Sequence, residues 1–223
     1  MPQTALPKTI RYALFDFDGV IADTSPLYME LDRTALMHFG CTPTDEELRS
    51  FIGVPSEVAG PALLETKGIH VTTEQYLEVW NSDKGVYGSP ELVPSEGLEE
   101  LWHLLRRRGA KIAVVSTTRC VSLVRALNHF QLLSCVDAIV GREMVERQKP
   151  DPEPYLRALG LMAPGDPTAV EQAIAIDDSP TGVASAMGGG FFTICYQGAS
   201  ERRDVTGADL AVSSFSELAG LLG

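Results

Sequence analysis

Two carboxylates directly follow a short apolar run near the amino terminus. The run is Tyr12 to Phe15, the acids are Asp16 and Asp18, and Gly19 comes next. Burying acids at the end of a hydrophobic segment is costly unless a cation or hydrogen bonds compensate. Gly19 allows a sharp turn and the close approach of a ligand. The pattern favours a site for a hard cation with oxygen ligands; the alternative is an acidic turn that caps the next helix.

Three further groups of polar residues occur later in the chain, and two of them also follow an apolar run. They are the hydroxyl cluster Ser116-Thr117-Thr118 with Arg119, the lysine Lys149, and the acid pair Asp177-Asp178. The hydroxyl cluster follows the apolar run 112–115, and the acid pair follows the apolar run 173–176. Singly, each has an ordinary explanation: hydroxyls cap helices, a loop lysine is solvated, and acids are favoured at helix amino termini.

The elements that position these residues are expected to be parallel strands separated by helices. Strands are predicted at 10–16, 112–115, 136–140, 173–176, 191–195 and 210–212, each around a short apolar stretch. Helical patterns between them, including one from Pro152 that Gly160 is expected to end, predict an α/β fold with a doubly wound parallel sheet. The carboxyl ends of parallel strands share one edge of a sheet. We therefore expect the acids, hydroxyls and lysine to meet there.

Residues 26–88 interrupt this alternation with a purely helical pattern, in which Ser56 is expected to cap a helix that runs to Leu64. Ser25-Pro26 precedes the segment, and Gly88-Ser89-Pro90 ends it. Such punctuation marks a domain boundary. The sequence predicts a core domain formed by 1–25 and 89–223, with an all-helical domain, 26–88, inserted after the first strand.

The order of acid pair, serine, lysine and second acid pair resembles the four signatures of the haloacid dehalogenase superfamily. Asp16-Phe17-Asp18-Gly19-Val20 is similar to the first signature, and the string from Lys149 to Tyr155 is similar to the third. The inserted segment resembles the cap of the β-phosphoglucomutase-like and phosphoglycolate phosphatase-like branch. In that branch the cap closes over the site, excludes water and selects the leaving group.

The resemblance implies roles for the polar residues. Asp16 is expected to attack phosphorus and form an aspartyl phosphate, while Asp18 acts as acid and then base. Lys149 is expected to place a positive charge beside Asp16. Mg²⁺ is the expected cofactor, with ligands from Asp16, the carbonyl of Asp18 and Asp178, and from Asp177 directly or through water. The expected phosphate-binding residues are Ser116, Thr117, Thr118 and Arg119, at a helix start.

These roles predict a Mg²⁺-dependent phosphatase acting on a small phosphomonoester, such as a sugar phosphate or a phosphoglycolate-like compound. A phosphomutase is the closest alternative, although Tyr28 stands where such mutases have a histidine and the turn 53–56 has no basic residue. A phosphonate hydrolase would need a cap lysine, and only Lys67 and Lys84 lie in the insert. A non-catalytic binding protein has no use for a nucleophile.

Composition restricts the partners. The net charge of −12 disfavours nucleic acid and anionic membranes as partners. The resemblance implies a small phosphorylated metabolite as the partner, and a site for such an anion needs local positive charge. The four cysteines, which have no paired spacing, indicate a reducing compartment. No apolar run reaches the ~18 residues of a membrane span. We expect a cytoplasmic protein that is a monomer or a weak homodimer.

Overall fold

The computed structural model describes residues 6–51, 54–80, 85–200 and 205–222. The chain divides into two compact units. The first is formed by Met1–Asp23 with Val93–Gly223, and the second is Thr24–Leu92. The insert expected at 26–88 lies within the second unit. Of that segment, residues 52–53 and 81–84, which include Lys84 and part of the turn 53–56, lie outside the described residues.

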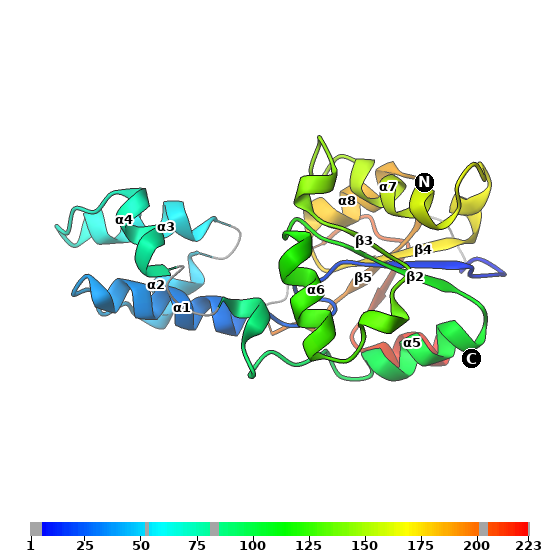
Figure 1. Ribbon diagram of the computed structural model, residues 1–223, viewed down its shortest axis with the longest axis horizontal. Helices are drawn as coiled ribbons and strands as arrows, with labels where there is room; N and C mark the ends of the chain where they lie inside the picture. Colours follow the sequence, from blue (N-terminus) through cyan, green and yellow to red (C-terminus); the bar gives the residue numbers. More distant parts are fainter. Residues whose placement is uncertain (1–5, 52–53, 81–84, 201–204, 223) are drawn as a thin grey trace. The chain divides into compact units, whose positions relative to one another are not determined.

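A six-stranded parallel sheet forms the centre of the first unit (Figure 1). Its strands are β1 (Tyr12–Phe15), β2 (Lys111–Val115), β3 (Ala138–Val140), β4 (Ala173–Asp177), β5 (Phe192–Tyr196) and β6 (Leu210–Val212). Their order is β3-β2-β1-β4-β5-β6, so β1 lies in the interior with β2 and β4 as neighbours. The strand order reverses direction between β1 and β4, which is where open α/β sheets place their ligands.

Helices cover both faces of this sheet, which confirms the predicted fold class. They are α5 (Leu98–Arg107), α6 (Cys120–His129), α7 (Glu153–Met162), α8 (Pro180–Gly188) and α9 (Phe215–Leu222). Successive strand residues point to opposite faces. Leu14 accordingly packs in the cluster that contains Tyr155 of α7, while Phe15 packs on Trp102 of α5 and Phe215 of α9. β1 is thereby held from both sides.

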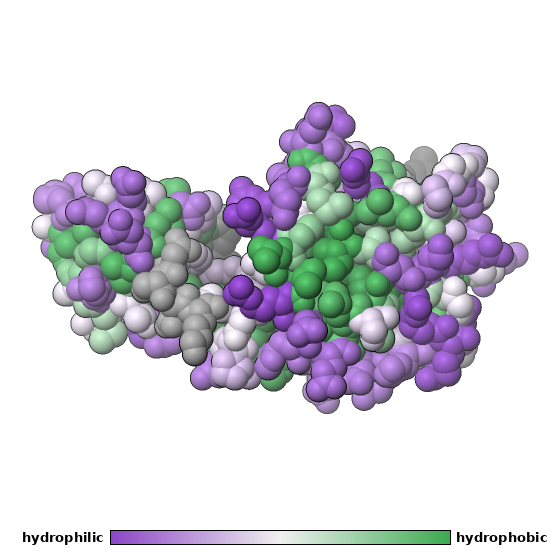
Figure 2. Space-filling view, viewed as in Figure 1, coloured by the Kyte–Doolittle hydropathy of each residue, from purple (hydrophilic) through white to green (hydrophobic). Residues whose placement is uncertain are grey.

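The edge strand β3 is three residues long, and α6 packs beside it. Figure 2 shows hydrophobic side chains gathered over this part of the first unit, and Val121 and Val124 of α6 are among the exposed ones. A short edge strand next to a helix offers little backbone for pairing with another chain.

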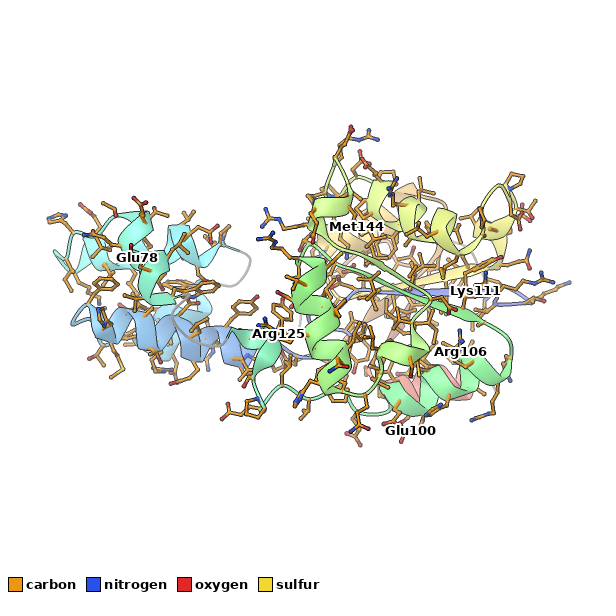
Figure 3. All side chains as sticks on the ribbon, in the orientation of Figure 1. Glu78, Glu100, Arg106, Lys111, Arg125 and Met144 are labelled. Atoms are coloured by element: carbon orange, nitrogen blue, oxygen red, sulfur yellow. The ribbon has the colours of Figure 1, made fainter. Side chains whose placement is uncertain are left out.

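Basic residues at the amino-terminal ends of the strands serve structural contacts. Lys111, the first residue of β2, donates from Nζ to the carbonyl of Met162 at 2.7 Å. Arg106 of α5 pairs with Asp137 at 2.5 Å. Both basic residues are labelled in Figure 3. Lys111 marks the edge of the sheet opposite to the strand ends that carry the acids.

The regular elements among the described residues of the second unit are all helices, and the unit has a hydrophobic core of its own. Its elements are α1 (Ser25–His38), α2 (Asp45–Arg49), α3 (Ser56–Thr66), α4 (Thr73–Trp80) and the 3₁₀ turn η1 (Val86–Gly88). The buried residues that form this core are Ala35, Leu36, Cys41, Leu48, Phe51, Leu64 and Tyr76. Across the described residues of both units, no helix combines the length and the apolar character needed to cross a membrane.

A buried acid joins three helices of the second unit. Asp32 of α1 accepts hydrogen bonds from Ser56 Oγ of α3 at 3.1 Å, and from Tyr76 Oη at 3.1 Å and Trp80 Nε1 at 2.8 Å on α4. Burial raises the pKa of Asp32, and these hydrogen bonds act in the opposite direction. Gly60 permits the arrangement, because a Cβ there would lie 2.1 Å from the Tyr76 ring.

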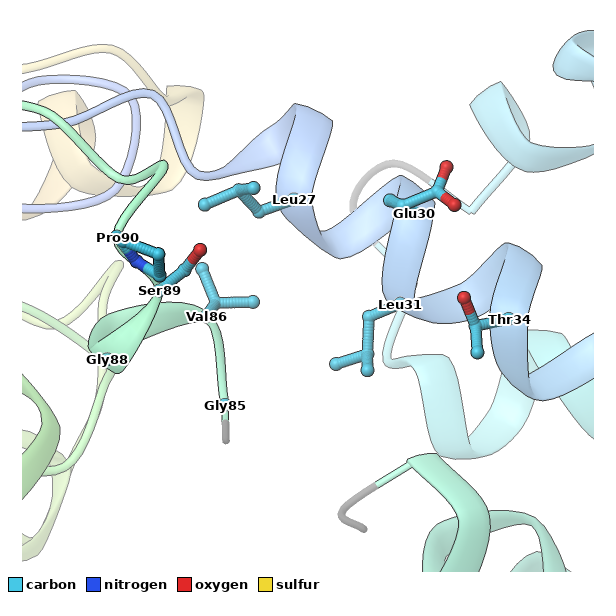
Figure 4. Close-up of a pocket in the computed structure, with 9 residues that line it drawn as sticks. All are labelled: Leu27, Glu30, Leu31, Thr34, Gly85, Val86, Gly88, Ser89 and Pro90. Carbon is cyan, nitrogen blue, oxygen red and sulfur yellow. The ribbon is translucent and has the colours of Figure 1, made fainter. Parts of the chain in front are cut away.

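A cavity of about 210 Å³ also lies within the second unit, between α1 and the η1 segment (Figure 4). Its wall contains the apolar residues Leu27, Leu31, Val86 and Pro90. Among the described residues of the wall, Glu30 is the one carboxylate, and that side chain pairs with Arg33 at 3.3 Å. The described wall therefore lacks the convergent acids expected of a phosphoryl-transfer site.

Two local predictions are wrong. Ser56 is the first residue of α3, with Pro55 as the N-cap, because its hydroxyl bonds to Asp32 and not to the helix backbone. Gly160 lies inside α7, which continues to Met162. The packing of Leu159 and Met162 against the sheet outweighs the weak helix propensity of Gly160.

Candidate active site

The carboxyl ends of three neighbouring strands supply the polar residues of this site. Asp16 follows β1, Ser116 follows β2, and Asp177 ends β4 with Asp178 directly after it. All four side chains are buried. Lys149 reaches the same place from the loop between β3 and α7, after which the Lys149–Pro150 peptide bond is cis. The expected meeting of acids, serine and lysine is therefore present in the structure.

The Lys149 ammonium is held by three acceptors. Its Nζ lies 2.7 Å from Asp16 Oδ1, 2.8 Å from Asp177 Oδ2 and 3.0 Å from the carbonyl oxygen of Val115. The ammonium also lies 5.0 Å from the ring centroid of Tyr155. A lysine has three N–H donors, so each donor has an acceptor, and the charge is fixed beside Asp16.

The buried charges shift one another's proton affinity. Burial raises the pKa of Asp16 well above its usual value; Lys149 opposes this rise, and the nearby acids add to it. Burial would also raise the pKa of Asp177, but the charge and hydrogen bond of Lys149 hold it below its usual value. Burial would lower the pKa of Lys149, but Asp16 and Asp177 raise it. The proton therefore stays on Lys149.

Two hydroxyls orient the carboxylate of Asp18. Ser116 Oγ lies 3.2 Å and Thr118 Oγ1 lies 3.0 Å from Asp18 Oδ2. The backbone N–H of Thr118 donates to Ser116 Oγ at 3.0 Å, which leaves the Ser116 proton for Asp18. These two expected phosphate-binding residues thus contact the expected acid–base residue.

The other two expected phosphate-binding residues lie outside this network. Thr117 and Arg119 are exposed, and Arg119 is the N-cap of α6. The N–H of Cys120, the first of α6, donates to the carboxylate of Glu143 at 3.0 Å. The helix start expected to bind an anion is therefore partly occupied by an anion of the protein itself.

The donor set and its surroundings fit a hard cation. Oxygen atoms of Asp16, Asp177 and Asp178 lie within 4.8 Å of one another. Asp178 also packs closely on the first turn of the site, since a Cβ at Gly19, where φ is +83°, would lie 2.4 Å from Asp178 Oδ2. Oxygen ligands and surplus negative charge suit Mg²⁺ and not a thiolate- or imidazole-preferring metal.

Asp177 also receives contacts that sequence reasoning did not anticipate. Tyr155 donates its hydroxyl to Asp177 Oδ2 at 2.6 Å, while the backbone N–H and the hydroxyl of Ser179 donate to Oδ1 at 2.9 and 2.7 Å. Ser179 could have been predicted as a partner, because a buried Asp177 needs hydrogen-bond donors and Ser179 lies only two residues away. Tyr155 carries no such local signal, because only the folding of the chain brings this residue of α7 next to Asp177 at the end of β4.

Two helical glycines make a matched stability test. A Cβ at Gly182 of α8 would lie 1.9 Å from Asp177 Oδ2, whereas none of the described atoms lies within 4 Å of a Cβ at Gly160. We expect Gly160→Ala to raise the free energy of unfolding by about 0.5–1 kcal/mol. Gly182→Ala should lower it by about 1–3 kcal/mol, since Asp177 must move. Denaturant unfolding measures both, and equal stability of the two variants would contradict the packing at Gly182.

The family model, the curated relatives and the solved structures that match this chain agree with the family resemblance of its sequence motifs. The family model described as haloacid dehalogenase-like hydrolase matches residues 13–195. The phosphorylated carbohydrates phosphatase of Thermotoga maritima is 29% identical over 79% of this chain and 80% of its own. The β-phosphoglucomutase of Bacillus subtilis is 25% identical over 94% and 92%. The structure of CbbY from Rhodobacter sphaeroides in complex with phosphate is 25% identical, with a TM-score of 0.72, and covers 96% of this chain and 100% of that one.

Proposed function

The chain belongs to the haloacid dehalogenase-like hydrolase family, and we propose that it is a Mg²⁺-dependent phosphatase that hydrolyses a small phosphomonoester. The observation that carries the proposal is the buried Lys149–Asp16 pair at 2.7 Å, among further carboxylates at the switch point of the sheet. A relative named as a phosphatase of phosphorylated carbohydrates supports a sugar phosphate as the substrate. We propose the second unit as the cap that selects the leaving group.

In the first half-reaction Asp16 is the nucleophile. One of its carboxylate oxygens bonds to phosphorus as the bond from phosphorus to the leaving oxygen breaks, which produces an aspartyl phosphate and an alcohol. Asp18 gives its proton to the leaving oxygen. The hydroxyls of Ser116 and Thr118 hold Oδ2 of Asp18 and thereby orient its carboxyl group.

In the second half-reaction water attacks the phosphorus of the aspartyl phosphate. Asp18 takes the water proton, the bond from Asp16 to phosphorus breaks, and inorganic phosphate leaves. Lys149 keeps its proton throughout and offsets the negative charge on Asp16. The site then returns to its starting protonation state.

Asp16, Asp178 and the backbone carbonyl of Asp18 are the residues that we propose to hold Mg²⁺. Bound there, Mg²⁺ would neutralise phosphoryl charge and orient the phosphoryl group. The burial-driven rise in the pKa of Asp16 would be reversed by a nearby cation, which leaves the nucleophile ionised.

Contacts in the second unit weigh against the alternatives. A mutase must exclude water while a sugar phosphate accepts the phosphoryl group. Tyr28, at the position of the mutase histidine, stacks on Trp80 and donates its hydroxyl to Tyr87 at 3.1 Å. Lys67, a candidate for phosphonate chemistry, pairs with Glu47 at 2.5 Å. Tyr28 therefore does not supply the cation that the mutase needs, and the pairing with Glu47 keeps Lys67 protonated, whereas Schiff-base chemistry needs a neutral amine.

A product assay tests the proposed function. The enzyme is incubated with β-glucose 1-phosphate, Mg²⁺ and a trace of the sugar bisphosphate. We expect inorganic phosphate to be the main product, because Tyr28 stands at the position of the histidine that assists gating in the mutases that this chain resembles. Formation of glucose 6-phosphate faster than free phosphate would show a mutase. If neither product forms, an aryl phosphate assayed with and without Mg²⁺ separates a different substrate from an inactive site.

A further inference from the structure

Both oxygens of Asp177 are fully engaged by donors of the protein. Oδ2 accepts from Lys149 Nζ and Tyr155 Oη, and Oδ1 accepts from the backbone N–H and the hydroxyl of Ser179. A carboxylate offers about four lone-pair sites. Asp177 lies close enough to Asp16 and Asp178 to share a cation with them, but its lone pairs are already used.

Tyr155 contacts the Lys149–Asp177 pair in two ways. Its hydroxyl lies 2.6 Å from Asp177 Oδ2, and the face of its ring lies 5.0 Å from Lys149 Nζ. The ring is fully buried and packs on Phe191, with centroids 5.9 Å apart. A short hydrogen bond to a charged acceptor is stronger than a neutral one, and a cation over an aromatic face is attracted to it. One rigid side chain thus restrains both ions.

We propose that Tyr155 is a positioning residue for the phosphatase reaction. With Lys149 it fills Oδ2 of Asp177, which fixes Asp177 as the support of Lys149 and leaves cation binding to Asp16, Asp178 and the carbonyl of Asp18. The proposal rests on the proposed function, because it assigns Tyr155 an effect on turnover. Tyr155 itself lies behind Lys149 and does not touch the substrate.

The test is Tyr155→Phe, which keeps the ring and removes only the hydroxyl. Tyr12→Phe is the matched control, since Tyr12 packs against the same hydrophobic cluster from β1. We expect Tyr155→Phe to lower kcat by about ten-fold, as losses of supporting hydrogen bonds commonly do. KM for an aryl phosphate and the Mg²⁺ affinity measured by calorimetry should stay within about three-fold, because neither ligand contacts Tyr155. Tyr12→Phe should match the wild type in all three quantities.

Distinct results would overturn this proposal. A kcat for folded Tyr155→Phe within about two-fold of the wild type would reduce Tyr155 to a packing role. A loss of Mg²⁺ affinity of more than about ten-fold would mean that Tyr155 acts through the metal ligands. A wild type with no Mg²⁺-dependent turnover would instead defeat the proposed function, before any variant is compared.

Discussion

Asp16→Asn is expected to fold normally and to lose turnover by roughly three orders of magnitude or more. The amide nitrogen of asparagine is not a nucleophile. Asp18 is held by Ser116 and Thr118, so it does not replace Asp16 as the attacking carboxylate. Folding should be preserved, because the remaining amide oxygen can still accept from Lys149 and because burial disfavours the charge that is removed.

The measurement is kcat on an aryl phosphate, together with the unfolding midpoint. Asp45→Asn is the matched control: it removes the same charge from an exposed residue that pairs with Arg33 at 2.8 Å. It should retain wild-type kcat. Retention of more than about a tenth of the activity in folded Asp16→Asn would remove Asp16 from the nucleophile's role.

Removal of the metal should have the second-largest effect. Excess chelator is expected to abolish turnover, and Mg²⁺ is expected to restore it, because the buried carboxylates repel an anionic substrate unless a cation offsets them. Asp178→Ala should raise the half-saturating Mg²⁺ concentration by at least about ten-fold.

Titration of activity with Mg²⁺ measures this requirement, and calorimetry measures binding without turnover. Asp45→Asn again serves as the control and should leave the Mg²⁺ titration unchanged. Full activity in excess chelator would exclude the metal from the reaction. An unchanged titration for Asp178→Ala would exclude only that ligand.

The architecture and the meeting of the main polar residues could be predicted because each rests on a local pattern. An apolar run followed by Asp16, and another followed by Asp177, give both a strand and the position of its polar end. The parallel order then brings distant strand ends to one edge. The acids, Ser116 and Lys149 could therefore be assigned to one site without knowledge of their side-chain contacts.

The contacts that were not predicted depend on tertiary packing. Glu143 reaches the start of α6 from the next loop, and Tyr155 reaches Asp177 from α7. Asp32 reads as a surface acid on a helix, yet donors from two other helices make its burial tolerable. No spacing within the sequence encodes such partners, because the donors become neighbours only after the helices pack.

Because the first unit is formed by two separate parts of the chain, its folding depends on the order in which the ribosome synthesises them. The second unit is one continuous segment, 24–92, and can fold as soon as it leaves the ribosome. β1 is made earlier but must wait for β2 and then for β4, on the order of ten seconds at typical elongation rates. A nascent chain that ends before Asp177 already carries Asp16, the proposed nucleophile, and Lys149, but not Asp177, the acid that pairs with that lysine. The candidate active site is thus assembled only after most of the chain has been synthesised.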